Sequence, residues 1–187
     1  TTKNGLDAPS WHNNSDYNIN FNPVLHFDGT DDGLDFYDDY LFSENDGLEI
    51  LAIVQPETGS QGSRNYIVDI GLHPGGGYGL GYASDSLRLY GGYDYGGKDL
   101  GVSQSSGTEP VYLRGEINFG AEFKVYVNHT AVIDETNTLT QLACDQIDAT
   151  KTHESLTGPL TIGQQSKTTS LSGRLFDGSI AELIVYD

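Results

Sequence analysis

The chain concentrates carboxylates in one segment near its N-terminal end. Between Asp28 and Glu49 there are nine acidic residues and no basic one. Like charges this close repel one another, and a bound cation offsets the repulsion. Calcium prefers oxygen ligands from carboxylates, carbonyls and water. The start of the segment therefore predicts a structural calcium site, with the candidate ligands Asp28, Asp31, Asp32 and Asp35.

The same residues also allow an interpretation without metal. The run Asp28-Gly29-Thr30-Asp31-Asp32 fits an Asx-turn, in which side-chain oxygens accept hydrogen bonds from nearby backbone N–H groups. It does not fit an EF-hand loop, which requires a bidentate Glu at its end. From the residues alone, both interpretations stay open.

A second candidate site lies in the glycine-rich run from Gly91 to Gly101. Glycines let a loop wrap tightly enough for carbonyls to join two spaced carboxylates around one ion. Such an ion keeps a position for an anionic ligand group, and tyrosines beside it supply contact area. The predicted ligand-binding residues are Tyr93, Asp94, Tyr95, Gly96, Gly97 and Asp99, with Asp94 and Asp99 also as calcium ligands. The alternative is a loop tip without a role.

One further acid interrupts an apolar run. Asp69 follows Val68 and precedes Ile70, so we expect it either on an exposed sheet edge or paired at the rim of the fold. It is included among the candidate calcium ligands. These predictions together imply more than one calcium ion.

The composition excludes several classes of function. The chain has 27 acidic and 9 basic residues, for a formal net charge of −18. A surface this acidic does not bind nucleic acid or dock on anionic membranes. Its one cysteine, Cys144, excludes a disulfide framework and a cysteine-based zinc site. No apolar run is long enough for membrane insertion.

Short apolar runs alternate with Gly, Asp, Asn and Ser, which predicts an all-β fold of two antiparallel sheets. A hairpin is expected to turn at Asn128-His129, and one short helix is expected around Leu139–Asp145. The predicted strands are Val24–Phe27, Gly33–Phe36, Leu48–Gln55, Asn65–Gly71, Gly77–Ala83, Leu87–Tyr90, Val111–Gly115, Glu122–Val127, Ala131–Asp134, Leu160–Gly163 and Ser179–Tyr186.

Three motifs resemble bacterial laminin-G-like domains of the concanavalin A-like superfamily. They are the run Phe27-Asp28-Gly29-Thr30-Asp31-Asp32, the hairpin Tyr126-Val127-Asn128, and the closing run from Phe176 to Asp187. The resemblance spans nearly the whole chain. It implies a jelly-roll β-sandwich and one laminin-G-like ligand-binding domain over residues 1–187.

The acidic, Gly- and Tyr-rich composition more narrowly resembles the calcium-dependent peptide-binding domain of giant repeats-in-toxin adhesins. That resemblance implies a secreted or cell-surface adhesin module, monomeric within a larger chain. It would bind peptide C-termini or proteins on another cell through calcium near one rim. A carbohydrate-binding, lectin-like module of the same fold is the alternative.

An enzyme is the remote alternative. Glu116 and Glu122, with Asn118 between them, loosely resemble the carboxylate strand of jelly-roll β-glucanases. Retaining glycoside hydrolysis needs two carboxyls about 5 Å apart on one face. Because a bend between the two glutamates would separate them, we expect no catalysis.

Overall fold

The computed structural model describes residues 7–16, 18–41, 48–57, 65–72, 76–83, 86–91, 98–102, 108–118, 122–136, 157–164 and 175–186. All regular structure in these residues is β-strand. Within them, no helix has the length and apolar character needed to cross a membrane.

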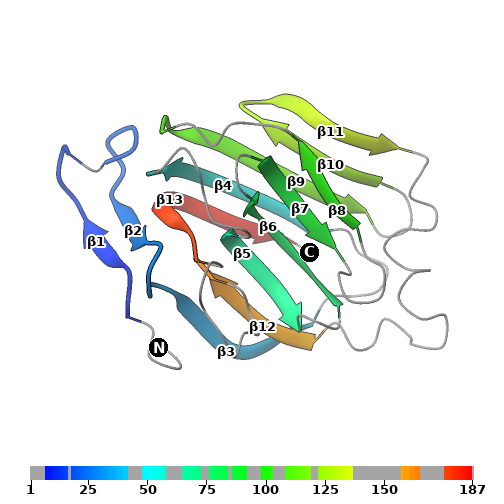
Figure 1. Cartoon of the computed structure of the whole chain (residues 1–187), viewed down its shortest axis with the longest axis horizontal. Coiled ribbons are helices and arrows are strands. Elements are labelled where there is room, and N and C mark those ends of the chain that lie inside the picture. Colours follow the sequence, from blue (N-terminus) through cyan, green and yellow to red (C-terminus); the bar gives the residue numbers. More distant parts are fainter. Residues whose placement is uncertain are drawn as a thin grey trace.

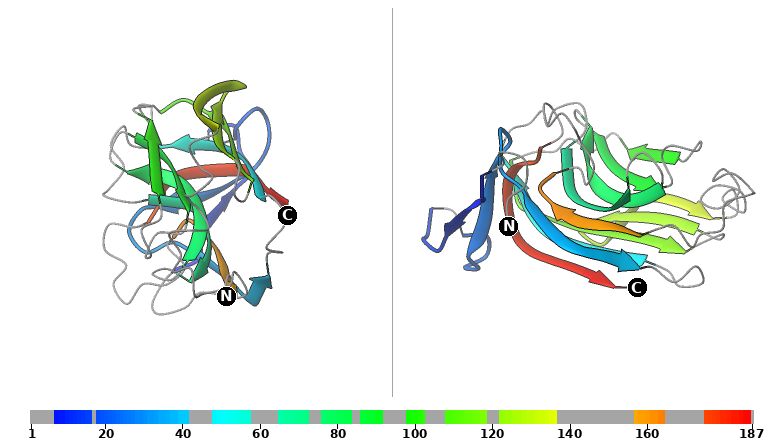
Figure 2. Two further views of the ribbon diagram at one scale, coloured as in Figure 1. Left: turned by 90° about the vertical axis from the view of Figure 1, so that its right-hand side faces the viewer. Right: turned by 90° about the horizontal axis from the view of Figure 1, so that it is seen from below.

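The strands form two antiparallel sheets that stack face to face (Figure 1). One sheet has seven strands in the order β1-β2-β13-β4-β9-β10-β11, and the other has six in the order β3-β12-β5-β6-β7-β8. Figure 2 shows that the strands are bent rather than flat. The arrangement is the predicted concanavalin A-like jelly roll. The strand bounds are β1 Ser10–His12, β2 Val24–Asp28, β3 Leu34–Leu41, β4 Leu48–Pro56, β5 Asn65–Leu72, β6 Gly76–Ala83, β7 Ser86–Gly91, β8 Lys98–Val102, β9 Val111–Asn118, β10 Glu122–Val127, β11 Thr130–Thr136, β12 Thr157–Ile162 and β13 Asp177–Tyr186.

Strand alternation explains why the two sheets pack together. Along β4, every second residue from Leu48 to Pro56 is buried, and the residues between are half-buried. Side chains on a strand point alternately to the two faces of its sheet, so such a strand covers one core. The core contains Phe27, Ile50, Val54, Val68, Ile70, Leu80, Tyr82, Leu113, Val125 and Phe176, among others.

All eleven predicted strands are present, and two short strands were not predicted. β1 is a three-residue edge strand, and β8 falls in the glycine-rich run that was expected to be a loop. In β8, Leu100 pairs with Leu89 and Val102 pairs with Leu87. Two apolar residues among glycines are a weak local signal, and pairing with β7 decides the outcome. The predicted helix around Leu139–Asp145 lies outside the described residues.

The predicted hairpin turn between β10 and β11 is confirmed. Asn128 and His129 both have positive φ, at 48° and 68°, as a type I′ turn requires. The turn is fastened to β9, because Asn128 Oδ1 accepts the Tyr112 N–H at 3.0 Å and the Asn128 N–H donates to the Tyr112 carbonyl at 2.9 Å. The His129 ring stacks on the Tyr112 ring, with centroids 4.8 Å apart.

We expect Asn128→Ala to lower the free energy of unfolding by about 1–2 kcal/mol, because it loses the acceptor for Tyr112 and puts alanine at positive φ. Chemical denaturation followed by tyrosine fluorescence measures the change. Asn128→Gly is the matched control, because glycine tolerates positive φ but lacks the acceptor. It should lose less stability than Asn128→Ala; an equal loss would exclude backbone strain as a cause.

Candidate functional site

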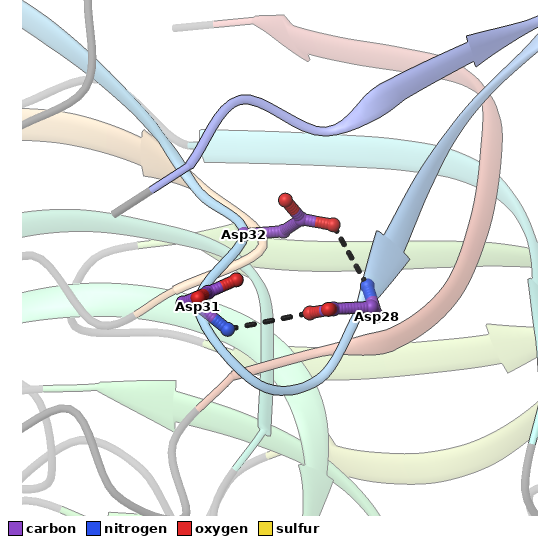
Figure 3. Close-up of side chains that lie close together, drawn as sticks. All are labelled: Asp28, Asp31 and Asp32. Atoms are coloured by element: carbon purple, nitrogen blue, oxygen red, sulfur yellow. Dashed lines mark hydrogen bonds between the residues drawn. The ribbon is translucent and has the colours of Figure 1, made fainter. Parts of the chain in front are cut away.

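Three of the predicted metal ligands meet in one turn. Asp28 ends β2 in the seven-stranded sheet, and the chain then crosses to β3 in the six-stranded sheet. Within this crossing, carboxylate oxygens of Asp28, Asp31 and Asp32 all lie within 4.8 Å of one another. Figure 3 shows the three side chains grouped at the turn that follows β2. A crossing between sheets therefore gathers acids that a straight strand would separate.

The backbone bends around these carboxylates through hydrogen bonds. Asp28 Oδ1 accepts the Thr30 N–H at 2.8 Å. It also accepts the Asp31 N–H at 3.3 Å, and Asp32 Oδ2 accepts the Asp28 N–H at 2.9 Å (Figure 3). Gly29 has φ of +70°, which suits glycine. The predicted Asx-turn is thus present. It engages one oxygen each of Asp28 and Asp32, so the turn is compatible with a cation as well.

Asp32 is the least accessible of the three, at 8% exposed. Burial is the main cause that raises the pKa of its carboxyl above the ordinary value. The hydrogen bond from Asp28 lowers that pKa, while the negative charges of Asp28 and Asp31 raise it further. A half-buried group of like charges without a counter-ion is electrostatically unfavourable, which is the condition that a cation relieves.

The donor set of this turn fits calcium. All three side chains offer hard oxygen ligands, which calcium and magnesium prefer over transition metals. A fourth carboxylate is near, because Asp177 pairs with Asp28 across the sheet and a Cβ on Gly29 would lie 2.8 Å from the Asp177 Cβ. Calcium would add carbonyl or water ligands to complete its coordination. Asp28, Asp31 and Asp32 are the residues that would hold it.

Asp35 and Asp69, the other two predicted ligands in the described residues before β8, are not part of this group. They lie instead in one row of paired residues across the six-stranded sheet. Register places one residue of each strand in a row across the six-stranded sheet. Core residues Leu160, Ile162 and Val68 occupy the alternate positions, so the row lies on the sheet face away from the core. From β3 to β8 the row reads Asp35, Thr161, Asp69, Gly79, Tyr90 and Asp99.

Side-chain contacts connect the first part of this row. Gln164 Nε2 donates to Asp35 Oδ1 at 2.6 Å, and the Thr161 hydroxyl donates to the carbonyl of Gln164 at 2.9 Å. Asp69 is 4% exposed and lies on β5, between β12 and β6. It is therefore neither on a sheet edge nor exposed, contrary to the first of the two expectations. Gly79 leaves room beside it, because a Cβ there would lie 3.1 Å from Asp69 Oδ1.

The second predicted site is only partly described. Tyr93, Asp94, Tyr95, Gly96 and Gly97 lie outside the described residues. Asp99 lies within β8, opposite Tyr90, so its backbone is a paired strand rather than part of a wrapped loop. That corrects the expected loop, and it puts Asp99 in the same register row as Asp35 and Asp69.

Glu116, which the sequence offered as a possible catalytic carboxylate, belongs to a charged cluster centred on β9. Arg114 forms ion pairs with Glu116 and with Glu49, the latter at 2.6 Å. Tyr126 donates its hydroxyl to Glu116 at 3.2 Å and carries the Arg114 guanidinium 5.2 Å from its ring centroid. The chain does turn after β9: Glu116 pairs with Lys124, and Glu122 with Asn118. Glu116 and Glu122 therefore occupy diagonal positions in the register of one hairpin, so the bend does not take them to different faces as was expected from the sequence.

A polar pocket of about 180 Å³ was not predicted from the sequence. Its lining comes from Asp16, His26, Gln55, Pro56, Glu57, Thr108 and Ser179. The available signal was a polar residue at an outward position of an otherwise apolar strand, as His26 is in β2. That signal is too common to single out a site, and the pocket exists only where five separate segments of the chain meet.

Comparisons with known proteins agree on the fold. No protein-family model and no curated protein matches the chain. Domain 4 of an extracellular arabinanase from Geobacillus stearothermophilus, solved with arabinotriose, is 16% identical with a TM-score of 0.64, over 97% of this chain and 76% of that one. Mouse laminin α1 domains LG4-5 are 12% identical with a TM-score of 0.59, and the match covers 96% of this chain and 43% of the laminin chain. The binding domain of botulinum neurotoxin DC, solved with rat synaptotagmin II, is 12% identical with a TM-score of 0.61. That match covers 96% of this chain and 42% of the neurotoxin chain.

These identities support the shared fold alone. The chain spans less than half the length of the laminin and neurotoxin chains that it resembles. Two of the three were solved with a bound partner, arabinotriose or rat synaptotagmin II, and the family of this chain is not established by them.

Proposed function

We propose that this chain is a calcium-dependent ligand-binding module of a bacterial surface adhesin, which binds peptide C-termini or proteins on another cell. The observation that carries the calcium part is the group formed by Asp28, Asp31 and Asp32, whose oxygens lie within 4.8 Å of one another. Calcium there would fasten the crossing between the two sheets.

The ligand-binding part is supported by the fold and by charge. The botulinum binding domain with a similar fold was solved with a protein, rat synaptotagmin II. In this chain a net charge of −18 makes direct capture of an anionic group unfavourable unless a cation intervenes. A second calcium held by Asp94 and Asp99 would provide that cation for a peptide carboxylate. We therefore propose the segment from Tyr93 to Asp99 as the ligand site.

A glycan is the second candidate ligand. The arabinanase domain with a similar fold was solved with arabinotriose. Tyrosine rings such as Tyr93 and Tyr95 stack on sugars as readily as they contact peptides. The two ligand classes predict the same calcium dependence and differ only in what binds.

We propose that the module binds without catalysing a reaction. Glu116 forms an ion pair with Arg114 and accepts a hydrogen bond from the Tyr126 hydroxyl, so its carboxylate is already engaged by neighbours on the sheet surface. A glycosidase acid instead has to reach the glycosidic oxygen of a bound sugar.

Binding to a library of peptide C-termini and to a glycan array, each in calcium and in chelator, tests the proposal. We expect peptide binding in calcium and a loss of at least about tenfold in chelator, as for one charged contact removed. Asp94→Asn with Asp99→Asn should cause a similar loss in calcium.

Glu182→Gln is the matched control, because Glu182 is an exposed carboxylate on β13 outside both proposed calcium sites. It should bind as the wild type does. Equal binding in calcium and chelator would overturn calcium dependence. Binding on the glycan array alone would replace the peptide by a sugar ligand.

A further inference from the structure

The polar pocket lies on the seven-stranded sheet, away from the core. Register places Ser10, His26, Ser179 and Gln55 in one row across β1, β2, β13 and β4. The adjacent residues Phe27, Ile180 and Val54 belong to the core, so this row lies on the opposite face. Three members of the row, His26, Ser179 and Gln55, line the pocket.

Hydrogen bonds within the pocket fix which groups donate. Gln55 Nε2 donates one of its two N–H groups to the Thr108 carbonyl at 2.9 Å, and this bond fixes the orientation of the amide, whose oxygen can accept from a ligand. His26 contacts the Ser179 hydroxyl through Nδ1 at 3.3 Å and Glu57 through Nε2 at 3.4 Å. The imidazole thereby holds both of its neighbours in place.

The pocket as a whole is rich in hydrogen-bond acceptors. Asp16 and Glu57 contribute carboxylates, Gln55 an amide oxygen and Thr108 a backbone carbonyl. No lysine or arginine is among the residues that line it. Pro56 adds an apolar wall. An anionic ligand would meet two like charges here, whereas a cation with several N–H donors would meet acceptors on several sides.

The size restricts the ligand further. A volume of about 180 Å³ is below the 300–1,000 Å³ of typical pockets for drug-sized ligands, so it suits one small group. An ammonium or guanidinium at the end of an alkyl chain is of this kind. Its methylenes would lie against Pro56 while its N–H groups reach Glu57 and Asp16.

The same residues do not form a hydrolase. His26 hydrogen-bonds Ser179 and lies 3.4 Å from a Glu57 carboxylate oxygen, but acyl transfer also needs N–H donors aimed at an oxyanion. Ser179 lies on β13, which pairs with β2 on one side and β4 on the other. Ser179 is therefore an interior residue of the sheet, paired on both sides, and not at a turn that presents free N–H groups to a ligand.

We propose that this pocket binds an organic ammonium or guanidinium group carried by a partner molecule. The site shares no residue with the proposed calcium sites, and it does not depend on them. The cation could come from a basic peptide side chain or from an amino sugar, and the test separates these two sources.

Chemical-shift titration of the isotope-labelled 187-residue chain in chelator provides the test. The probes are Nα-acetyl-lysine amide, its Nε-acetylated neutral counterpart, glucosamine and glucose. We expect lysine amide to shift the Gln55 side-chain amide and the His26 ring resonances, and its neutral counterpart to leave them unchanged. A shift by glucosamine but not glucose would assign the cation to an amino sugar.

Glu57→Gln should weaken the binding by about tenfold or more, because it removes one charged contact. Glu182→Gln, with the same loss of charge outside the pocket, should bind normally. Equal shifts from charged and neutral probes would overturn the proposal, as would unchanged binding by Glu57→Gln or no shift from any ammonium probe. Calcium-dependent ligand binding could still hold in each case, because these titrations contain no calcium.

Discussion

Gly163→Ala is expected to lower the free energy of unfolding by about 3 kcal/mol or more, through overpacking and backbone strain together. Gly163 has φ of +75°, and a Cβ there would lie 2.3 Å from Cδ1 and Cε1 of the Phe27 ring. The ring cannot yield easily, because Phe27 is fully buried and packs edge-on against Phe176. Thermal and denaturant unfolding measure the loss.

The backbone at this glycine cannot move away either. The Gly163 N–H donates to the Ile67 carbonyl at 3.0 Å, and its carbonyl accepts the Phe176 N–H at 2.9 Å. The substitution should therefore displace Phe27, which directly precedes Asp28. Calcium affinity of the proposed turn site should fall along with stability.

A double-mutant cycle identifies the cause. Phe27→Leu shortens the side chain, so Gly163→Ala should cost less in that background than in the wild type. Strictly additive losses would show that the Phe27 contact is not responsible, and would leave only the positive φ.

Calcium is expected to stabilise the fold by about 3 kcal/mol when its concentration is roughly a hundred times the dissociation constant. For a chain of this size that corresponds to a rise in melting temperature of about 5–10 °C. Asp32→Asn should remove the share of the rise that comes from the turn site. Differential scanning calorimetry in calcium and in chelator measures both values.

The same variant should behave differently without calcium. Asparagine still accepts the Asp28 N–H, and it relieves the repulsion with Asp28 and Asp31. Asp32→Asn in chelator at neutral pH should therefore be at least as stable as the wild type. If its calcium-induced rise equals that of the wild type or of Glu182→Gln, the turn is not a calcium site.

The pH dependence follows from the raised pKa of Asp32. Since that pKa is higher in the folded than in the unfolded state, protonation of this group favours folding. Its contribution is fully present below the ordinary Asp pKa and is lost as the pH rises through the raised folded value. Calcium needs the ionised form, so calcium stabilisation should fall as the pH drops through the same value. Asp32→Asn should flatten both trends.

The strands and the acidic turn after β2 were accessible from the sequence because they depend on local chemistry. Alternating apolar residues, as in β4, specify which face a strand buries whatever its partners are. Asp28 and Asp31 are close in the chain, so an Asx-turn brings them together without help from distant residues. The Asn128-His129 turn was predicted for the same reason.

Strand pairing required the tertiary structure. Residues 98–102 carry only two apolar side chains among glycine, lysine and aspartate, and they become β8 because β7 offers a partner of matching pattern. Asp69 lies between Val68 and Ile70, and from the sequence an acid in such an apolar run could lie either at a sheet edge or on an interior strand. Its place on an interior strand follows from β12 pairing with β5.

By itself, the sequence determined the all-β sandwich and the turn that gathers Asp28, Asp31 and Asp32. Only the tertiary structure decided that Asp35, Asp69 and Asp99 share one row and that His26, Gln55 and Ser179 share one pocket. The reason is physical: turns are set by interactions between neighbours in the chain, whereas register between distant strands is set by packing of the common core.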